Sequence, residues 1–352
     1  LGHPEFGQTI SRTDGMFDMV VNGGGKLVVD YALDGYAPAQ RHVDVNWNDS
    51  VWADDVALVP LDSVANVIDL SLATPIQVAR ASVQTDLDGS RQATLLFPAN
   101  TTAEMEMPDG STQPLSTITV RATEYTVGTD GPDSMPAPLP PTNGYTYAAE
   151  LSIDEALAAG ATDVRFNQEV YFYLENFLDV PVGTLVPVGF YNEAVGLWEP
   201  SQDGLVIEII SETSGAADID IDGDGVAEDP ALLESEIGLT LIEREQLATI
   251  YDAGETLWRA ATTHFSTIDC NFNPADRLYP NPRKPRTRPR KPEDEKPEKD
   301  PCKQTGSIIE CQSRVLRESI PLAGTGLTMN YRSDRSAEIH EVEVYLTSDS
   351  ID

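Results

Sequence analysis

Carboxylates at alternate positions mark one stretch of the chain as the part best suited to chemistry. Residues 218–229 read DIDIDGDGVAED, with acidic side chains alternating with small or apolar ones and two glycines among them. Alternating carboxylates on a sharply turning loop can surround one hard cation with oxygen atoms, which is how many proteins bind Ca²⁺. We therefore expect a calcium site with ligands from Asp218, Asp220, Asp222, Asp224, Val226 (through its carbonyl), Glu228 and Asp229.

Two registers fit this stretch, and the sequence leaves both open. A loop that starts at Asp220 places Gly225 at the sixth position and has no acid at the twelfth. A loop that starts at Asp218 places Gly223 at the sixth position and Asp229 at the twelfth. In either register the stretch resembles the D-x-D-x-D-G calcium loops of the dockerin, thrombospondin and EF-hand families. It lacks the helix that an EF-hand has on its N-terminal side.

The competing interpretation is an acidic, glycine-rich surface turn that binds nothing. Closely spaced carboxylates repel one another, which favours a neutralising cation. No general base or nucleophile accompanies the loop, so we expect a calcium ion with a structural role.

Motifs for catalysis are missing elsewhere in the sequence. The four histidines have no HxxH or HExxH spacing, and no G-x-S-x-G nucleophile motif occurs. The 58 acidic residues offer many chance carboxylate pairs, of which none is singled out for glycoside hydrolysis. We predict that the chain is not an enzyme. A sugar-binding face could be lined by the aromatic side chains of Tyr171, Phe172, Tyr173, Phe177, Tyr191 and Trp198, although packing inside a β-sandwich is their commoner use.

Composition and charge narrow the class of protein. The 352 residues carry 58 acidic and 23 basic side chains, a formal net charge of −35. Such a surface repels polyphosphate, so we expect no nucleic-acid partner, and it suits a protein that meets Ca²⁺ outside the cell. No run of about 18 apolar residues predicts a membrane span. Leu1 is not a start methionine and no signal-peptide pattern follows it, so we interpret the chain as a fragment.

Most of the chain alternates apolar and polar residues in the way that is typical of strands. Such runs, separated by Gly, Asn, Asp and Pro, predict a mainly β fold of tandem antiparallel β-sandwich domains. The proline-rich stretch 131–143 predicts a loop over the surface. The expected strands span residues 17–21, 26–31, 42–45, 92–97, 118–125, 145–153, 164–174, 186–192, 197–200, 204–211 and 255–266.

Two short helices are expected among the strands. Ser152 with Glu155, and Thr240 with Glu243, have the capping-box spacing. In a capping box, a hydroxyl and a carboxylate satisfy free N–H groups of the first helical turn. The first helix is expected to be short and the second to run to about residue 251.

Residues 276–303 form the clearest domain boundary. They hold seven prolines, ten Lys or Arg and six Asp or Glu, with almost no apolar side chains. Such a segment cannot bury enough surface to offset ordering, so we predict a disordered, proline-rich charged linker. Cys270 and Cys302 bracket it and could form a disulfide bridge in an oxidising compartment. Together with Cys311 they could equally be three ordinary thiols.

The first 58 residues carry a family resemblance. Residues 7–21 read GQTISRTDGMFDMVV, three glycines follow, and DGYAP begins at Asp34. These phrases resemble the latter part of a carboxypeptidase regulatory-like, or transthyretin-like, β-sandwich, a non-catalytic module. The resemblance implies a partial domain of that kind at residues 1–58. A β-sandwich region with the calcium loop would follow at residues 59–275.

The end of the chain resembles a second family. Residues 306–335 read GSIIECQSRVLRESIPLAGTGLTMNYRSDR, in which two apolar-alternating runs, 308–316 and 327–331, are joined by a turn. The stretch resembles the opening of the shell region in bacterial RHS (YD-repeat) proteins, whose repeats form a β-cage, often around a toxin. The resemblance implies that residues 304–352 contribute the first shell strands.

Together these observations favour a non-catalytic structural or interaction region of a secreted or surface RHS-repeat protein, of the polymorphic-toxin or adhesin type. The region would position or close the repeat shell. Its expected partners are the rest of that shell and a cell-surface protein or glycan. The competing interpretation is a calcium-dependent adhesion or carbohydrate-binding module. Both interpretations place the chain outside a bacterial cell or at its surface.

Overall fold

The computed structural model describes residues 7–22, 24–47, 50–139 and 144–272, and the backbone of residues 316–321 and 328–333. The fold is mainly β, as the sequence predicts, with 43% of residues in strands and 11% in helices. All strand pairs within the described residues are antiparallel. The predicted linker at 276–303 lies outside the described residues.

A six-stranded sheet forms one layer of the fold. Its strands are β3 (Asn66–Asp69), β10 (Thr117–Glu124), β11 (Ala148–Ile153), β14 (Gly189–Asn192), β15 (Leu197–Pro200) and β19 (Thr267–Asp269). Their order is β15-β14-β19-β11-β10-β3, so the strand latest in sequence lies in the middle of the layer. Ile118 and Val120 on β10 bury their side chains against the other layer, as period-two alternation requires.

A nine-stranded sheet forms the second layer. Its main path is β13-β16-β18-β12-β7-β4, with β17 added beside β16, and β8 and β9 added beside β12. A register shift between Arg165 and Val170 divides β12, which pairs with β8 before the shift and with β7 after it. The strands are β4 (Ile76–Arg80), β7 (Thr94–Pro98), β8 (Ala103–Glu106), β9 (Thr112–Leu115), β12 (Asp163–Glu175), β13 (Leu185–Val186), β16 (Gly204–Thr213), β17 (Ala216–Asp220) and β18 (Thr256–Phe265).

The main core lies between the two sheets. Both layers contribute fully buried side chains to one continuous cluster, including Ile118 and Leu151 from the first and Leu95, Phe172 and Trp258 from the second. This face-to-face packing confirms the predicted β-sandwich. The strands predicted between residues 92 and 266 form with ends that differ by a few residues, except the one at 186–192, which divides into β13 and β14 in different sheets. A small hairpin of β5 (Gln84–Asp86) and β6 (Gly89–Arg91) lies outside the two sheets.

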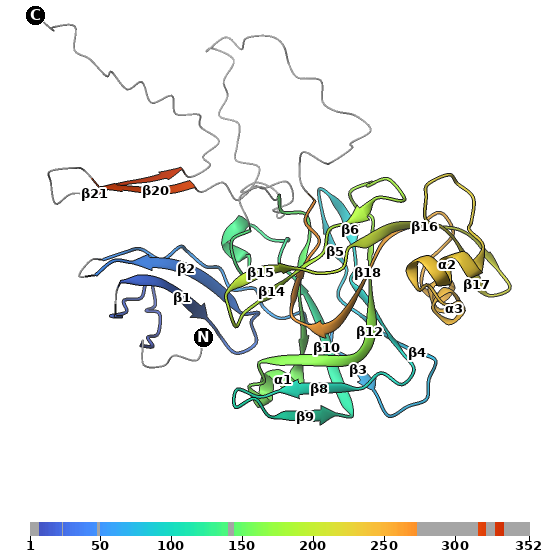
Figure 1. Ribbon diagram of the computed structural model, residues 1–352, viewed down its shortest axis with the longest axis horizontal. Coiled ribbons are helices and arrows are strands. Elements are labelled where there is room, and N and C mark those ends of the chain that lie inside the picture. Colours follow the sequence, from blue (N-terminus) through green and yellow to red (C-terminus); the bar gives the residue numbers. More distant parts are fainter. Residues whose placement is uncertain are drawn as a thin grey trace, which may run out of the picture.

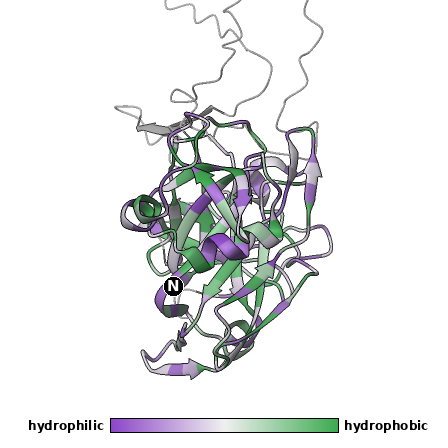
Figure 2. Cartoon of the chain, turned by 90° about the vertical axis from the view of Figure 1, so that its right-hand side faces the viewer, coloured by the Kyte–Doolittle hydropathy of each residue, from purple (hydrophilic) through white to green (hydrophobic). Residues whose placement is uncertain are grey.

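Two helices cover the outer face of the nine-stranded sheet. They are α2 (Pro230–Ile237) and α3 (Leu241–Ile250). Leu233 and Leu247 from the helices join Tyr173, Ile207 and Leu257 from the sheet in a second buried cluster. Figure 1 shows both helices beside β17 at one end of the molecule. Figure 2 faces that end and shows hydrophilic and hydrophobic stretches on the helices, as expected when one helix face is buried.

The helices correct part of the prediction. Helix α2 is not among the two expected ones, because Asp229, which caps its N-terminus through the N–H of Ala231, was assigned to the calcium loop. Thr240 caps α3 as predicted, accepting a hydrogen bond from the N–H of Glu243. The short helix α1 (Asp154–Ala159) forms without the predicted side-chain cap, because Ser152 stays inside strand β11.

The described part of the N-terminal segment (residues 1–58) lies against the outer face of the six-stranded sheet. Its described strands are β1 (Gly25–Tyr31) and β2 (Ala39–Val45), which pair only with each other in the described residues. Figure 1 shows this pair at the end of the molecule opposite α2 and α3. The strand predicted at residues 17–21 does not form.

Residues 131–139 differ from the predicted surface loop. They begin with a 3-10 helix, Gly131–Ser134, and bury the side chains of Met135 and Leu139 beside Ala37, Tyr125 and Tyr145. This third cluster joins the N-terminal segment to the sandwich. The stretch is therefore an internal packing element, because its apolar side chains find partners on both sides.

Two further predictions concern the end of the chain. Strands β20 (Leu316–Pro321) and β21 (Thr328–Ser333) form the expected hairpin, and the first strand begins later in the sequence than the predicted run at 308–316.

Cys270 is a buried free thiol, and burial raises the pKa of that thiol well above its usual value. Cys302 and Cys311 lie outside the described residues.

Candidate metal centre

The acidic stretch forms a tight loop between β17 and α2. Strand β17 delivers Asp220 into the structure, where its side chain is fully buried. One carboxylate oxygen, Oδ1, accepts hydrogen bonds from the N–H groups of Asp222 (3.0 Å) and Gly223 (2.7 Å), and Oδ2 accepts one from Gly225 (2.7 Å). The backbone of the loop is thus wrapped around this carboxylate.

Two more carboxylates complete the group. Asp222 accepts a hydrogen bond from the N–H of Asp224 (3.0 Å), and Asp224 accepts one from the N–H of Val226 (2.8 Å). One side-chain oxygen from each of Asp220, Asp222 and Asp224 lies within 4.8 Å of the others. This spacing and the all-oxygen donor set suit a hard cation such as Ca²⁺.

The two glycines let the loop turn and approach its neighbours. Gly223 and Gly225 have φ angles of 81° and 79°, in the left-handed region that glycine adopts at no steric cost. A Cβ atom on Gly223 would lie 2.9 Å from the carbonyl oxygen of Val182. The metal-binding candidate is therefore held against the segment that leads into β13.

Glu228 lies beside the group. Both of its carboxylate oxygens accept a hydrogen bond from the N–H of Ile221, each at 3.1 Å. Partial burial raises the pKa of its carboxyl group, and the charges of Asp220 and Asp222 raise it further. Repulsion between these acids is what a bound cation would relieve.

Asp218 and Asp229 have other partners. Asp218 accepts hydrogen bonds from the hydroxyls of Ser211 and Thr213 and from the guanidinium of Arg244 (3.1 Å), and the hydrogen bond from Thr213 is the main reason that its pKa is lowered. Asp229 caps helix α2. The geometry therefore favours the register that starts at Asp220. The sequence Asp229-Pro230, an N-cap followed by a first-turn proline, is the signal that could have indicated this assignment.

A buried ion pair fixes the helices beside this loop. Glu243 on α3 accepts hydrogen bonds from Arg259 on β18 (2.9 Å and 3.1 Å) and from the hydroxyl of Tyr173 on β12 (2.5 Å). Arg259 also donates to the carbonyl of Ile237 at the end of α2 (2.9 Å). Both charged side chains are almost fully buried, and sequence reasoning did not find them.

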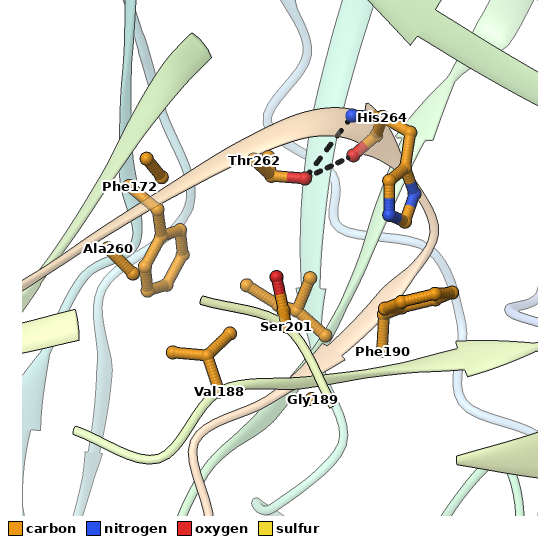
Figure 3. Close-up of a pocket in the computed structure, with 10 residues that line it drawn as sticks. Phe172, Val188, Gly189, Phe190, Ser201, Ala260, Thr262 and His264 are labelled. Atoms are coloured by element: carbon orange, nitrogen blue, oxygen red, sulfur yellow. Dashed lines mark hydrogen bonds between the residues drawn. The ribbon is translucent and has the colours of Figure 1, made fainter. Parts of the chain in front are cut away.

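A small pocket lies between β14 and β18, and Figure 3 shows its lining. Phe172, Val188 and Ala260 make it largely apolar, and His264 and Ser201 are its main polar members. Burial lowers the pKa of the His264 imidazole, which keeps the ring neutral at pH 7, and the ring packs edge-on against Phe190. No carboxylate belongs to this lining, so the pocket pairs no acid with a base.

The aromatic side chains considered for a sugar-binding face lie in separate places. Phe172 belongs to the core between the sheets and Tyr173 to the cluster under the helices. Trp198 is half-buried, packs on Tyr191 with ring centroids 5.2 Å apart, and borders the cluster under the N-terminal segment. They do not form one exposed face.

Comparisons with known proteins address the N-terminal segment. A family model described as the Teneurin TTR-like domain matches residues 1–58. Teneurin-m of Drosophila melanogaster is 40% identical over 52 residues, which cover 15% of this chain and 2% of that protein. No solved structure matches. Residues 1–58 are thus similar to a transthyretin-like (TTR-like) domain, as expected, whereas the RHS-repeat resemblance of residues 306–335 stays a prediction.

The described residues contain no helix with the length and apolar character that crossing a bilayer requires.

Proposed function

We propose that this chain is a non-catalytic, calcium-stabilised structural region of an extracellular protein. Its task is to hold the TTR-like segment (residues 1–58) in a fixed position on the β-sandwich. The observation that carries this proposal is the contact between them. Gln40, Arg41 and His42 on β2 hydrogen-bond to the hairpin β14–β15 and to residues 133–136, over a shared apolar cluster.

The contact between β2 and residues 133–136 favours one fixed position of the TTR-like segment. The guanidinium of Arg41 is buried and donates to the carbonyls of Asp133 (2.9 Å), Met135 (3.0 Å) and Pro136 (3.2 Å). A buried cation with several backbone partners is costly to expose unpaired, which disfavours sliding or release of the segment.

Calcium would act at the opposite end. Asp220, Asp222, Asp224 and the carbonyl of Val226, with Glu228 beside them, would hold the ion. Bound Ca²⁺ supplies positive charge that neutralises the loop. The chain's own contribution is to fix the carboxylates with backbone N–H groups and to join the loop to α2. Extracellular calcium modules of this kind bind at roughly 10⁻⁴–10⁻³ M, so the site suits a protein outside the cell.

A position before an RHS-repeat shell is the finer part of the proposal. It is supported by the resemblance of residues 306–335 and by the proline-rich composition of residues 276–303, which would separate the shell from the region described here. The partners would be the rest of that shell and a cell-surface molecule.

Thermal unfolding of the full chain, paired with a glycan-binding screen, tests the proposal. Chelation of Ca²⁺ is expected to lower the unfolding temperature by several degrees, since a ligand that binds only the folded state stabilises it. No glycan is expected to be retained. Glycan binding that disappears on chelation and in Trp198→Ala would replace the scaffold by a carbohydrate-binding module.

A further inference from the structure

Glu150 is a buried carboxylate in an unusual place. It lies on β11 in the middle of the six-stranded sheet, with only 6% of its surface exposed, on the face that carries the TTR-like segment. Its carboxylate accepts hydrogen bonds from the hydroxyls of Thr267 on β19 and Tyr125 after β10. Within the described part of the chain no Lys, Arg or His forms a salt bridge with it.

The hydroxyl of Tyr125 connects this carboxylate to the TTR-like segment. It lies 3.1 Å from the carbonyl oxygen of Pro38, just before β2, and 3.5 Å from Oε2 of Glu150. A phenol has one proton and can donate to only one of these acceptors at a time. An ionised carboxylate attracts that proton more strongly than a neutral carboxyl group does, since charge-assisted hydrogen bonds are stronger.

We propose that docking of the TTR-like segment on the sandwich is linked to protonation of Glu150. When Glu150 carries a proton, the Tyr125 hydroxyl is free to donate to Pro38. When Glu150 ionises, Tyr125 turns to the carboxylate, and the Pro38 carbonyl loses its donor at a buried contact. The contact therefore tightens as pH falls and loosens as pH rises.

The surroundings favour the protonated form. Burial raises the pKa of the Glu150 carboxyl to about 8, and the negative charge of Glu193 adds to the shift. The sign follows from linkage: the docked state holds the proton up to about pH 8, whereas an exposed carboxyl gives it up near pH 4.5. The stabilisation of the contact that comes from protonated Glu150 is thus fully present below about pH 4.5, and it is lost as pH rises towards 8.

Other charged groups face the same contact. Arg41 on β2 is buried, and its guanidinium donates hydrogen bonds to four backbone carbonyls. Asp30 accepts a hydrogen bond from Gln40, and its pKa is raised by burial. Further ionisable groups of the surrounding elements include Tyr31 on β1, Tyr191 and Glu193 on the β14–β15 hairpin, Asp269 on β19, Asp133 in the 3-10 helix and His42 on β2.

Hydrogen exchange of the full chain as a function of pH tests the proposal. The backbone N–H of Gln40 donates to Pro136 (2.6 Å), so exchange of this N–H, corrected for its intrinsic pH dependence, reports docking. One linked proton predicts that protection falls by up to about tenfold per pH unit between roughly pH 5 and 8. Glu150→Gln, which is neutral at every pH, is expected to flatten this slope.

Two further variants separate the coupling from general stability. Tyr125→Phe removes the connecting hydroxyl but leaves Glu150 buried, so it is expected to lower the protection of Gln40 at pH 5, where the parent chain has the Pro38 hydrogen bond. This keeps the proposal testable if Glu150→Gln fails to fold. Glu175→Gln is the matched control: its carboxyl on β12 also has a pKa raised by burial, and its loss should leave the slope of β2 unchanged. An unchanged slope in Glu150→Gln, unchanged protection at pH 5 in Tyr125→Phe, or no slope in the parent chain would overturn the proposal.

Discussion

Neighbouring acids of similar sequence context have quite different roles at the scale of single residues. Asp220 is buried and receives three backbone N–H groups, Asp218 is paired with Arg244, and Asp229 caps a helix. The spacing of the acidic stretch could be read from the sequence. The different roles of these acids could not be read from the sequence, because they depend on Arg244 from α3 and on the residue at which α2 begins.

A buried charge network also belongs to this scale. Arg91 is 1% exposed, donates to Glu124 (2.6 Å and 2.8 Å) and Asp86 (2.9 Å and 3.1 Å), and lies over the ring of Phe177. Arg91→Met would leave two carboxylates without their cation. Removing one partner of such a buried network costs about 3–5 kcal/mol, which urea unfolding at pH 7 would measure.

Arg165→Met is the matched control for that prediction. Arg165 pairs with Asp163 at an exposed position, with 68% of its side chain accessible. Exposed pairs are worth about 0–1 kcal/mol, so this variant should unfold almost like the parent chain. Equal losses in the two variants would mean that the Arg91 network is not buried as described.

At the scale of elements, the tip of the β14–β15 hairpin packs closely against the TTR-like segment. Gly196 has a φ of 69°, and a Cβ there would lie 2.9 Å from Nε2 of His42 and 3.1 Å from Cγ2 of Val28. Gly196→Ala is therefore expected to cost about 1–2 kcal/mol for the left-handed backbone and about 1–3 kcal/mol more for overpacking. Urea unfolding of the full chain measures the sum.

Gly215, in the turn between β16 and β17, provides the comparison. Its φ is 86°, and a Cβ there would meet no atom within 4 Å. Gly215→Ala thus carries the backbone cost without the clash. If both variants lose the same stability, the hairpin tip does not bear on the TTR-like segment.

The sequence predicted elements well where a local pattern decides them. The alternation of apolar and polar residues predicted the strands of the sandwich, and the capping-box spacing at Thr240 predicted the start of α3. Prediction failed where tertiary packing decides. Ser152 has the spacing of a helix cap. However, the buried positions of β11 continue to Ile153, so Ser152 remains part of the strand. Met135 and Leu139 look like part of a polar surface loop until the N-terminal segment covers them.

Buried ion pairs show the same limit. Arg91 and Glu124 lie 33 positions apart, and Glu243 and Arg259 lie 16 apart. Nothing in the local sequence distinguishes these charges from the many exposed ones. Their pairing follows only from how the strands and helices pack together in the fold.

At the scale of the whole molecule, the two proposed control points lie at opposite ends of one sandwich. The TTR-like segment covers the outer face of the six-stranded sheet, and the acidic loop with α2 and α3 covers the outer face of the nine-stranded sheet (Figure 1). The main core separates them. We therefore expect calcium to stabilise the helical end and pH to act on the segment contact, each without the other.

Calcium binding itself is the most direct test of the account. Isothermal titration calorimetry of the full chain with Ca²⁺ is predicted to show binding at roughly 10⁻⁴–10⁻³ M. Binding should be lost in Asp220→Asn, which removes the acceptor of the Gly225 N–H and one ligand charge, and kept in Asp218→Asn, whose carboxylate belongs to Arg244. Failure of the parent chain to bind at millimolar Ca²⁺, or equal binding by both variants, would contradict a calcium centre at Asp220.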